Sequence, residues 1–347
     1  MKLLKSLIWM LIMALTLGMM VGCSDDDDDN GPAGPSTTDY FEDFVTTGSA
    51  YFGAGTKNIT GDALYADMGN GVELFVIDYR SADHYANVGH MDIDAVTGSN
   101  ATLVNWAIAD LMDNLDEIPA GAKVVNVCYS GQTASQATSA LRLLGYDAWN
   151  LKWGMCGWTS QDSINLGKWS GLTAGGWDLE TESNASSTYD YPMVESEEED
   201  AAVLMTSLID TYFEDGLKTI SSTDVFANVN DGDATNDLYI MNYWPPTYYD
   251  IGHIPGAVMF DSSVPEYKSL GLDALDELPT DQQIVVYCWT GQTSSQITVY
   301  LNLLGYDAYS MKNGINGIQS YDDSPDLYKD GTWYHAPDTD YPIAFGE

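Results

Sequence analysis

The sequence contains one cysteine-centred run twice, as Cys128–Thr133 (CYSGQT) and Cys288–Thr293 (CWTGQT). Each copy follows a short apolar run that favours a β-strand and precedes a stretch typical of a helix. Between 128–158 and 288–318, 17 of 31 positions are identical. The duplication predicts two copies of one fold, each with a cysteine at the C-terminal end of a strand.

The repeat extends beyond these runs. Leu74–Arg80 and Leu238–Trp244 both have the pattern of a buried parallel strand that ends in a loop. We therefore predict a first domain over 38–193 and a second over 194–347. The acidic run 195–200 is expected to cap a helix over 201–213.

Each repeat alternates strand-like and helix-like segments with short glycine-containing connections. This order predicts an α/β fold in which a mainly parallel sheet is flanked by helices on both faces. Ligands of such folds bind at the carboxyl ends of the strands. Both cysteines are expected at that edge.

The N-terminus has the pattern of an export signal. Two lysines precede an apolar run that is short for a membrane span, so 1–22 is predicted to be a signal peptide. The ending Val21-Gly22-Cys23 resembles the lipobox of bacterial lipoproteins, which implies lipidation of Cys23. A plain signal peptide or a short membrane anchor is the alternative.

The segment 23–37 contains five consecutive aspartates and a Gly-Pro stretch, so it is predicted to be a solvated tether. The expected location is extracytoplasmic, lipid-anchored to a bacterial membrane on an outer-membrane, periplasmic or surface face. The formal net charge of −40 disfavours nucleic acid as a partner and leaves the anchor as the only expected membrane contact. The oligomeric state stays open.

Besides Cys23, the chain has three cysteines, Cys128, Cys156 and Cys288. An odd number argues against a disulfide framework. Backbone N–H groups of a loop and the positive end of the following helix favour an anion, so we expect a lowered pKa for the loop thiols.

The other loop residues have candidate roles around the sulfur. Glycine allows the backbone to curl tightly, hydroxyl groups add donors, and the glutamines either donate to a bound group or hydrogen-bond the loop. The candidate substrate-binding or loop residues are Tyr129, Ser130, Gly131, Gln132, Thr133, Trp289, Thr290, Gly291, Gln292 and Thr293.

The combined motifs resemble the rhodanese family of sulfurtransferases. Its active loop, a cysteine with glycine at the fourth position before a helix, is matched by both runs. A second signature, Asp-x-Arg followed by Gly-His-Ile-x-Gly-Ala, resembles Asp78–Arg80 with Gly89–Ala95, and its latter half resembles Gly252–Ala257. The resemblance implies two tandem rhodanese-like domains over nearly the whole mature chain.

The resemblance implies sulfane-sulfur transfer through a cysteine persulfide, with Cys128 as main nucleophile and Cys288 as a second or vestigial one. The implied partners are a small sulfur-containing donor and a thiol or other nucleophilic acceptor. No cofactor and no metal are implied. Arg80 is the nearest candidate cation, supported by Asp78, although an ion pair of Arg80 with Asp83 or another acid is the structural alternative.

The loop residues bear on a possible phosphatase activity and on the choice of sulfur donor. Phosphatases with this family's fold need an arginine six residues after the cysteine to hold the phosphate oxygens. This chain has Ala134 and Ser294 at those positions, so phosphatase activity is not expected. Neither loop contains a basic residue, so polysulfide or a small persulfide is favoured over thiosulfate as donor.

Two alternatives to catalysis by sulfur transfer remain. One is a non-catalytic module that binds a partner or stores sulfur. The other is a thiol–disulfide redox protein that uses Cys128 with Cys156. The structural alternative for Cys156 is a small buried thiol without a chemical role. For His90 and His253 a structural hydrogen bond is expected instead of catalysis.

Overall fold

The computed structural model describes residues 37–169, 172, 177–233, 235–264 and 268–346. The predicted signal peptide, Cys23 and the tether up to residue 36 lie outside these residues. No helix in the described ranges is long and apolar enough to span a membrane.

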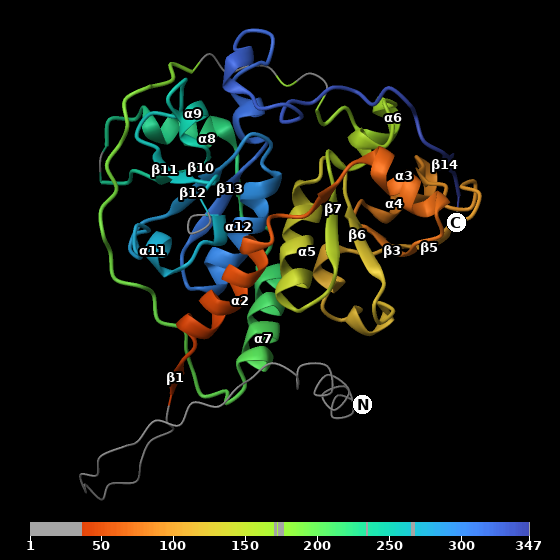
Figure 1. Ribbon diagram of the computed structural model, residues 1–347, viewed down its shortest axis with the longest axis horizontal. Coiled ribbons are helices and arrows are strands. Elements are labelled where there is room, and N and C mark those ends of the chain that lie inside the picture. The colour runs from red at the N-terminus through yellow and green to blue at the C-terminus, as the bar shows by residue number, and fades with distance from the viewer. Residues whose placement is uncertain (1–36, 170–171, 173–176, 234, 265–267, 347) are drawn as a thin grey trace, which may run out of the picture. The chain divides into compact units, whose positions relative to one another are not determined.

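The first repeat forms a five-stranded sheet of parallel strands (Figure 1). Its order is β2-β7-β6-β3-β5. The strands are β2 (Asn58–Ile59), β3 (Glu73–Asp78), β5 (Asn100–Asn105), β6 (Lys123–Val127) and β7 (Ala148–Leu151). The central strands β3 and β6 are almost wholly buried, as continuous apolar runs in a parallel sheet require.

The second repeat builds the same sheet again, in the order β11-β10-β12-β13-β9 with parallel pairs throughout. Its strands are β9 (Thr219–Ile220), β10 (Tyr239–Trp244), β11 (Val258–Asp261), β12 (Ile284–Tyr287) and β13 (Ala308–Met311). The equal strand order confirms the predicted duplication and fold class.

Four longer helices carry much of the core shared by the repeats. They are α2 (Phe41–Gly53), α5 (Gln132–Leu143), α7 (Ala201–Glu214) and α12 (Gln292–Leu303). Asp200 caps α7 by accepting the N–H of Ala202 at 2.8 Å, which confirms the predicted cap.

Short elements complete the chain. The shorter helices that lie wholly within the described residues are α3 (Gly61–Gly69), α4 (Ala82–Asn87), α6 (Asp162–Asn165), α8 (Ser222–Val229), α9 (Pro246–Tyr249) and α11 (Leu272–Leu275). The 3-10 turns are η1 (Ile108–Asp110), η2 (Leu115–Glu117), η3 (Gly154–Gly157), η4 (Gly314–Gly317) and η5 (Pro325–Leu327). The short strands β1 (Thr38–Asp39) and β8 (Glu195–Ser196) pair antiparallel, as do β4 (His90–Met91) and β14 (Ile343–Ala344).

One hydrophobic cluster joins the two repeats. It includes Phe52 of α2, Leu141 of α5, Ile209 of α7 and Ile297 of α12, and α5 packs directly on α12. Two further clusters are centred on Trp158 in the first repeat and on Trp244 in the second, and each also includes residues from the final segment of the other repeat. The helices that follow the two cysteines are thus buried against each other.

Each repeat is covered by the final segment of the other. From the first repeat, Glu180 exchanges backbone hydrogen bonds with His253 at 3.0 and 2.9 Å. From the second, Ile343 pairs with Met91 in the β14–β4 ladder, and Tyr341 donates its N–H to the carbonyl of Trp158 at 3.1 Å. The two repeats therefore interlock at both ends.

Candidate active site

Cys128 lies between β6 and α5, and the loop of residues 128–133 (the Cys128 loop) curls around its sulfur. The N–H groups of Gly131 and Ala134 donate to Cys128 Sγ at 3.1 and 3.5 Å. Gly131 has a φ of 84°, a left-handed conformation that only glycine adopts without strain. The glycine therefore allows the backbone to point its donors at the sulfur.

The pKa of Cys128 is raised above the ordinary thiol value, because burial disfavours the thiolate. The N–H donors of Ala134, Ser130 and Gly131 lower it, and the negative charge of Asp78 raises it. The predicted lowering of this pKa is therefore wrong in its net direction. The Cys128 residue is only 4% exposed, so desolvation outweighs the cradle of N–H groups.

The turn η3 donates backbone hydrogen bonds to the Cys128 loop. Met155 donates its N–H to the carbonyl of Cys128 at 2.8 Å, and Cys156 donates to that of Tyr129 at 3.4 Å. A Cβ on Gly154 would come within 2.3 Å of the Cys128 carbonyl oxygen. The Gly-rich turn after β7 is thus part of the site.

Cys288 is held in a similar way by the Cys288 loop, residues 288–293, with a different set of contacts to the sulfur. Ser294 donates its N–H to Cys288 Sγ at 3.4 Å, and Ile315 of η4 donates to the Cys288 carbonyl at 2.9 Å. In addition, the Cys288 thiol lies 3.7 Å from Ser294 Oγ, which is 2.8 Å from Ser310 Oγ. In the first repeat the position of Ser294 is taken by Ala134, so Cys128 has no equivalent hydroxyl there.

Tyr129 lies among polar and cationic groups. The guanidinium of Arg80 is 5.7 Å from its ring centre, and Lys168 Nζ is 6.0 Å away. His84 meets the ring edge-on at 5.5 Å, and Ser81 Oγ is 3.4 Å from the phenol oxygen. Lys168 is exposed, so it places positive charge beside the Cys128 loop.

The Arg80 side chain is buried, and its guanidinium is engaged in an ion pair and hydrogen bonds within the scaffold. Its Nη2 lies 2.7 Å from Asp78 Oδ2, and it also donates to the carbonyls of Ile164 and Gly89. The guanidinium thus ties the end of β3 to two neighbouring segments. The acid beside Arg80 is Asp78.

Trp289, the counterpart of Tyr129, lies among aromatic rings. Trp244 and Tyr248 each lie with ring centres 5.1 Å from it, and its indole N–H donates to the carbonyl of Leu327 at 3.0 Å. Trp244 occupies the position of Arg80, so the second site has an apolar wall in place of the ion pair.

The remaining loop residues bond mainly within the scaffold. Ser130 Oγ accepts from Gln132 Nε2 at 3.2 Å, and Thr290 Oγ1 accepts the N–H of Gln292 at 3.2 Å. Thr133 and Thr293 are half-buried in the first turns of α5 and α12. The side-chain carbonyls of both glutamines accept hydrogen bonds from the opposite repeat.

Sequence reasoning missed Lys168 and Trp169. Trp169 donates its indole N–H to the carbonyl of Ser130 at 3.0 Å, so the segment after α6 closes one side of the Cys128 loop. These residues lie outside the aligned repeat 128–158, so no local pattern in the sequence links them to Cys128.

Cys156 is a free, buried thiol 3.8 Å from the carbonyl of Asn165. Burial raises its pKa to about 12. His90 and His253 place Nδ1 at 2.9 and 2.8 Å from backbone carbonyls, the structural bonds that the sequence suggested. Across the described ranges, no three His, Cys, Asp or Glu side chains come together as a metal site.

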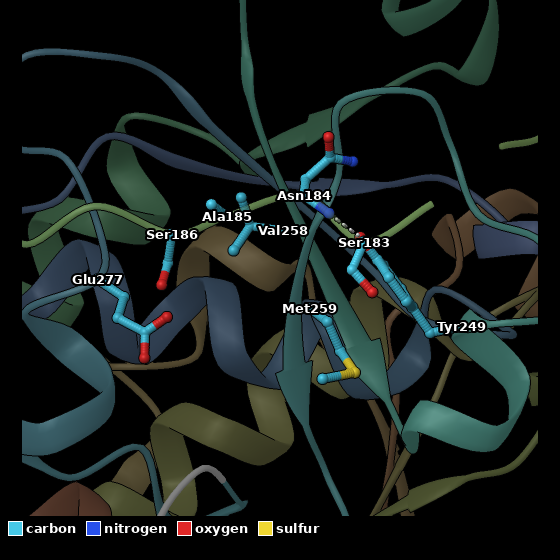
Figure 2. A pocket seen from close by; sticks show the side chains of 8 residues that line it. All are labelled: Ser183, Asn184, Ala185, Ser186, Tyr249, Val258, Met259 and Glu277. Atoms are coloured by element: carbon cyan, nitrogen blue, oxygen red, sulfur yellow. Dashed lines mark hydrogen bonds between the residues drawn. The ribbon is translucent and has the colours of Figure 1, made fainter. Parts of the chain in front are cut away.

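A hollow of about 390 Å³ lies elsewhere, in the second repeat (Figure 2). The segment 183–186, Tyr249, Val258, Met259 and Glu277 line it, and the N–H of Asn184 donates to the Tyr249 hydroxyl at 3.3 Å. Neither cysteine loop contributes to this hollow.

Comparison with known proteins gives a consistent family. The profile of the Rhodanese-like domain matches residues 60–161 and again 227–321. No match was found among curated proteins.

Solved structures give matches of two lengths. A Rhodanese-like domain protein from Staphylococcus aureus is 25% identical, and its alignment covers 30% of this chain and 91% of its own, with a TM-score of 0.25. A thiosulfate sulfurtransferase from Pseudomonas aeruginosa is 15% identical over 84% of this chain and 49% of its own, with a TM-score of 0.28.

Proposed function

Because the chain belongs to the rhodanese-like family and carries two copies of the domain in tandem, we propose that it is a sulfurtransferase. Cys128 is the main nucleophile and Cys288 a second one. The observation that carries the proposal is the cradle of N–H groups at Cys128 Sγ, with Gly131 at 3.1 Å and Ala134 at 3.5 Å. Such preorganised donors stabilise an anionic sulfur.

The reaction has two displacements. The Cys128 thiolate attacks the sulfane sulfur of the donor, a Cys–S–S bond forms, and the donor's S–S bond breaks. Its electron pair leaves with the departing thiolate, which takes up a proton. A nucleophilic acceptor then attacks the outer sulfur, and the electron pair of the breaking bond regenerates the Cys128 thiolate.

The cations near the Cys128 loop are not placed to hold the oxygens of an oxyanion donor. Arg80 is neutralised by Asp78 at 2.7 Å, and Lys168 lies beside Tyr129 instead of within the loop. The sulfonate oxygens of thiosulfate would need a forked cation to hold them, whereas polysulfide and persulfide have no such oxygens. Polysulfide or a small persulfide therefore fits this site better.

Burial supports sulfur storage as the second candidate. Cys288 is 3% exposed, about as buried as Cys128, but Trp289 beside it also packs against the rings of Trp244 and Tyr248. A persulfide formed there is shielded from acceptors. The redox alternative is weaker, since a pKa of about 12 leaves Cys156 a poor attacking thiol.

For the N-terminus we propose export and lipidation at Cys23, which anchors the protein outside the cytoplasm. Incorporation of labelled palmitate by cells, lost on Cys23→Ser, would support this. Labelling that persists in the variant would contradict it.

The testing experiment is intact-mass measurement of the signal-free protein after exposure to polysulfide and, separately, to thiosulfate. Cys128→Ser and Cys288→Ser variants are treated alongside. We expect a cyanide-removable sulfur that disappears with Cys128→Ser, and a released product when a thiol acceptor is added. Loading without release to any acceptor would favour storage, and absence of loading from both donors would refute the proposal.

A further inference from the structure

The two loop glutamines reach across the interface between the repeats. Gln292 Oε1 accepts the N–H of Trp153 at 3.1 Å and the side-chain amide of Asn150 at 2.8 Å. In return, Gln132 Oε1 accepts the N–H of Asn313 at 2.8 Å. Trp153 and Asn313 occupy the same position in the two repeats, with φ of 68° and 63°. The exchange is therefore reciprocal.

These contacts are buried and closely packed. Gln132 is 9% exposed and Gln292 is 1% exposed. A Cβ on Gly131 would meet Gln292 Oε1 at 2.7 Å, and one on Gly291 would meet Gln132 Oε1 at 2.8 Å. The glycine of each loop thus leaves room for the glutamine of the other loop. A buried N–H that lost its acceptor here would remain unsatisfied, which is costly.

Trp153 leads into the turn that supports the Cys128 loop. Two residues later, Met155 donates its N–H to the Cys128 carbonyl at 2.8 Å. That hydrogen bond holds the Cys128 peptide in place at the start of the Cys128 loop. The loop in turn directs the N–H groups of Gly131 and Ala134 at Cys128 Sγ. A continuous series of contacts therefore runs from the second repeat's glutamine to the first repeat's thiol.

We infer that Gln292 is a positioning residue for Cys128 and that each cysteine site is completed by a glutamine from the opposite loop. The inference rests on the proposed function only in taking Cys128 as the reactive thiol. It follows that the first repeat does not build a full thiol cradle on its own. A change in the Cys288 loop alters the reactivity of Cys128.

The test measures alkylation of Cys128 by iodoacetamide across pH, by peptide mass spectrometry of the full signal-free chain in a Cys288→Ser background. Gln292→Met removes the acceptor at similar length, and Gln292→Asn keeps the amide but is one methylene too short to reach Trp153. Both should move the Cys128 pKa upward and slow alkylation below that pKa about threefold to tenfold.

Ser139→Ala is the matched control. It removes another hydrogen bond between the repeats, from Ser139 Oγ to the carbonyl of Gln296 at 2.7 Å, without touching the turn at Trp153. Its alkylation profile should equal that of the background. An unchanged profile in the folded Gln292 variants, or an equal shift in Ser139→Ala, would overturn the inference.

The readout separates this inference from the proposed function, because alkylation needs no sulfur donor. A shifted profile without any sulfur loading would refute the sulfurtransferase and leave the positioning role intact. Normal sulfur loading with an unshifted alkylation profile would support the sulfurtransferase and refute the positioning role of Gln292.

Discussion

Cys128 and Cys288 share a backbone scaffold and differ in the side chains around it. A turn behind each loop donates an N–H to the cysteine carbonyl, at 2.8 Å from Met155 and 2.9 Å from Ile315. The residue after Cys128 meets Arg80 and Lys168, whereas the residue after Cys288 meets aromatic rings. The comparison teaches that backbone geometry sets the thiol cradle, while the surroundings of each loop are free to diverge.

The largest expected effect comes from breaking the shared scaffold. Gly154→Ala places a Cβ within 2.3 Å of the Cys128 carbonyl oxygen at a φ of 57°. We expect a loss of about 2–4 kcal/mol in the free energy of unfolding. Reactivity of Cys128 should fall with it, measured by denaturant unfolding and alkylation.

Gly314→Ala is the counterpart in the second repeat, where the Cβ would lie 2.1 Å from the Cys288 carbonyl oxygen. It should affect Cys288 first. Gly121→Ala is the control, because φ is 84° there but no atom lies within 4 Å of the new Cβ. An equal loss of unfolding free energy in Gly121→Ala would show that backbone strain at a positive φ explains the effect without the clash of the new Cβ.

The pH dependence of Cys128 tests the balance between burial and the N–H cradle. Burial raises its pKa, so the thiolate fraction should keep rising with pH beyond the ordinary thiol pKa. Sulfur loading at Cys128 should increase about tenfold per pH unit below that pKa. A loading rate that levels off below the ordinary thiol pKa would contradict the raised pKa.

The hydroxyl beside Cys288 gives the next smaller effect. Ser294→Ala removes the Oγ that lies 3.7 Å from Cys288 Sγ. In the structure this hydroxyl oxygen accepts from the Cys288 thiol, and once the thiol has lost its proton the hydroxyl can turn and donate to the thiolate. Alkylation of Cys288 should therefore slow about threefold when the hydroxyl is removed. Ala134→Ser, the reverse change beside Cys128, should speed alkylation there by a similar factor. An unchanged rate at Cys288 in Ser294→Ala, together with an unchanged rate at Cys128 in Ala134→Ser, would show that the hydroxyl has no effect.

The smallest effect concerns charge at the first site. Lys168 lies exposed beside Tyr129, so it should favour anionic reagents at Cys128. Lys168→Met is expected to lower the ratio of iodoacetate to iodoacetamide rates at Cys128 about twofold, most clearly at low salt. The same ratio at Cys288 serves as an internal control. A parallel change at both cysteines would argue against local steering.

Much of the fold followed from local patterns. The apolar run before each cysteine forms β6 or β12, and the loop glycine at the fourth position, Gly131 or Gly291, takes the left-handed conformation that starts α5 or α12. The N-terminal cap of α7 at Asp200 was likewise predicted from the sequence. These features depend on neighbours within a few residues, which the sequence displays directly.

The interlocking segments could not be predicted. Asp190-Tyr-Pro192 and Asp340-Tyr-Pro342 end both repeats, but Tyr341 packs with Trp158 of the first repeat, and Tyr191 donates to Leu272 of the second. The sequence repeats suggest two separate domains, and nothing periodic marks which sheet a final segment covers.

By itself the sequence determined the duplication, the parallel sheets and the position of both cysteines, because strand, loop and helix propensities act over short distances. Only the tertiary structure decided that Arg80 pairs with Asp78 and that Gln292 contacts Trp153. It also decided that burial outweighs the N–H donors at Cys128. Desolvation and contacts over long sequence separations arise when the two repeats pack together, so no local pattern records them.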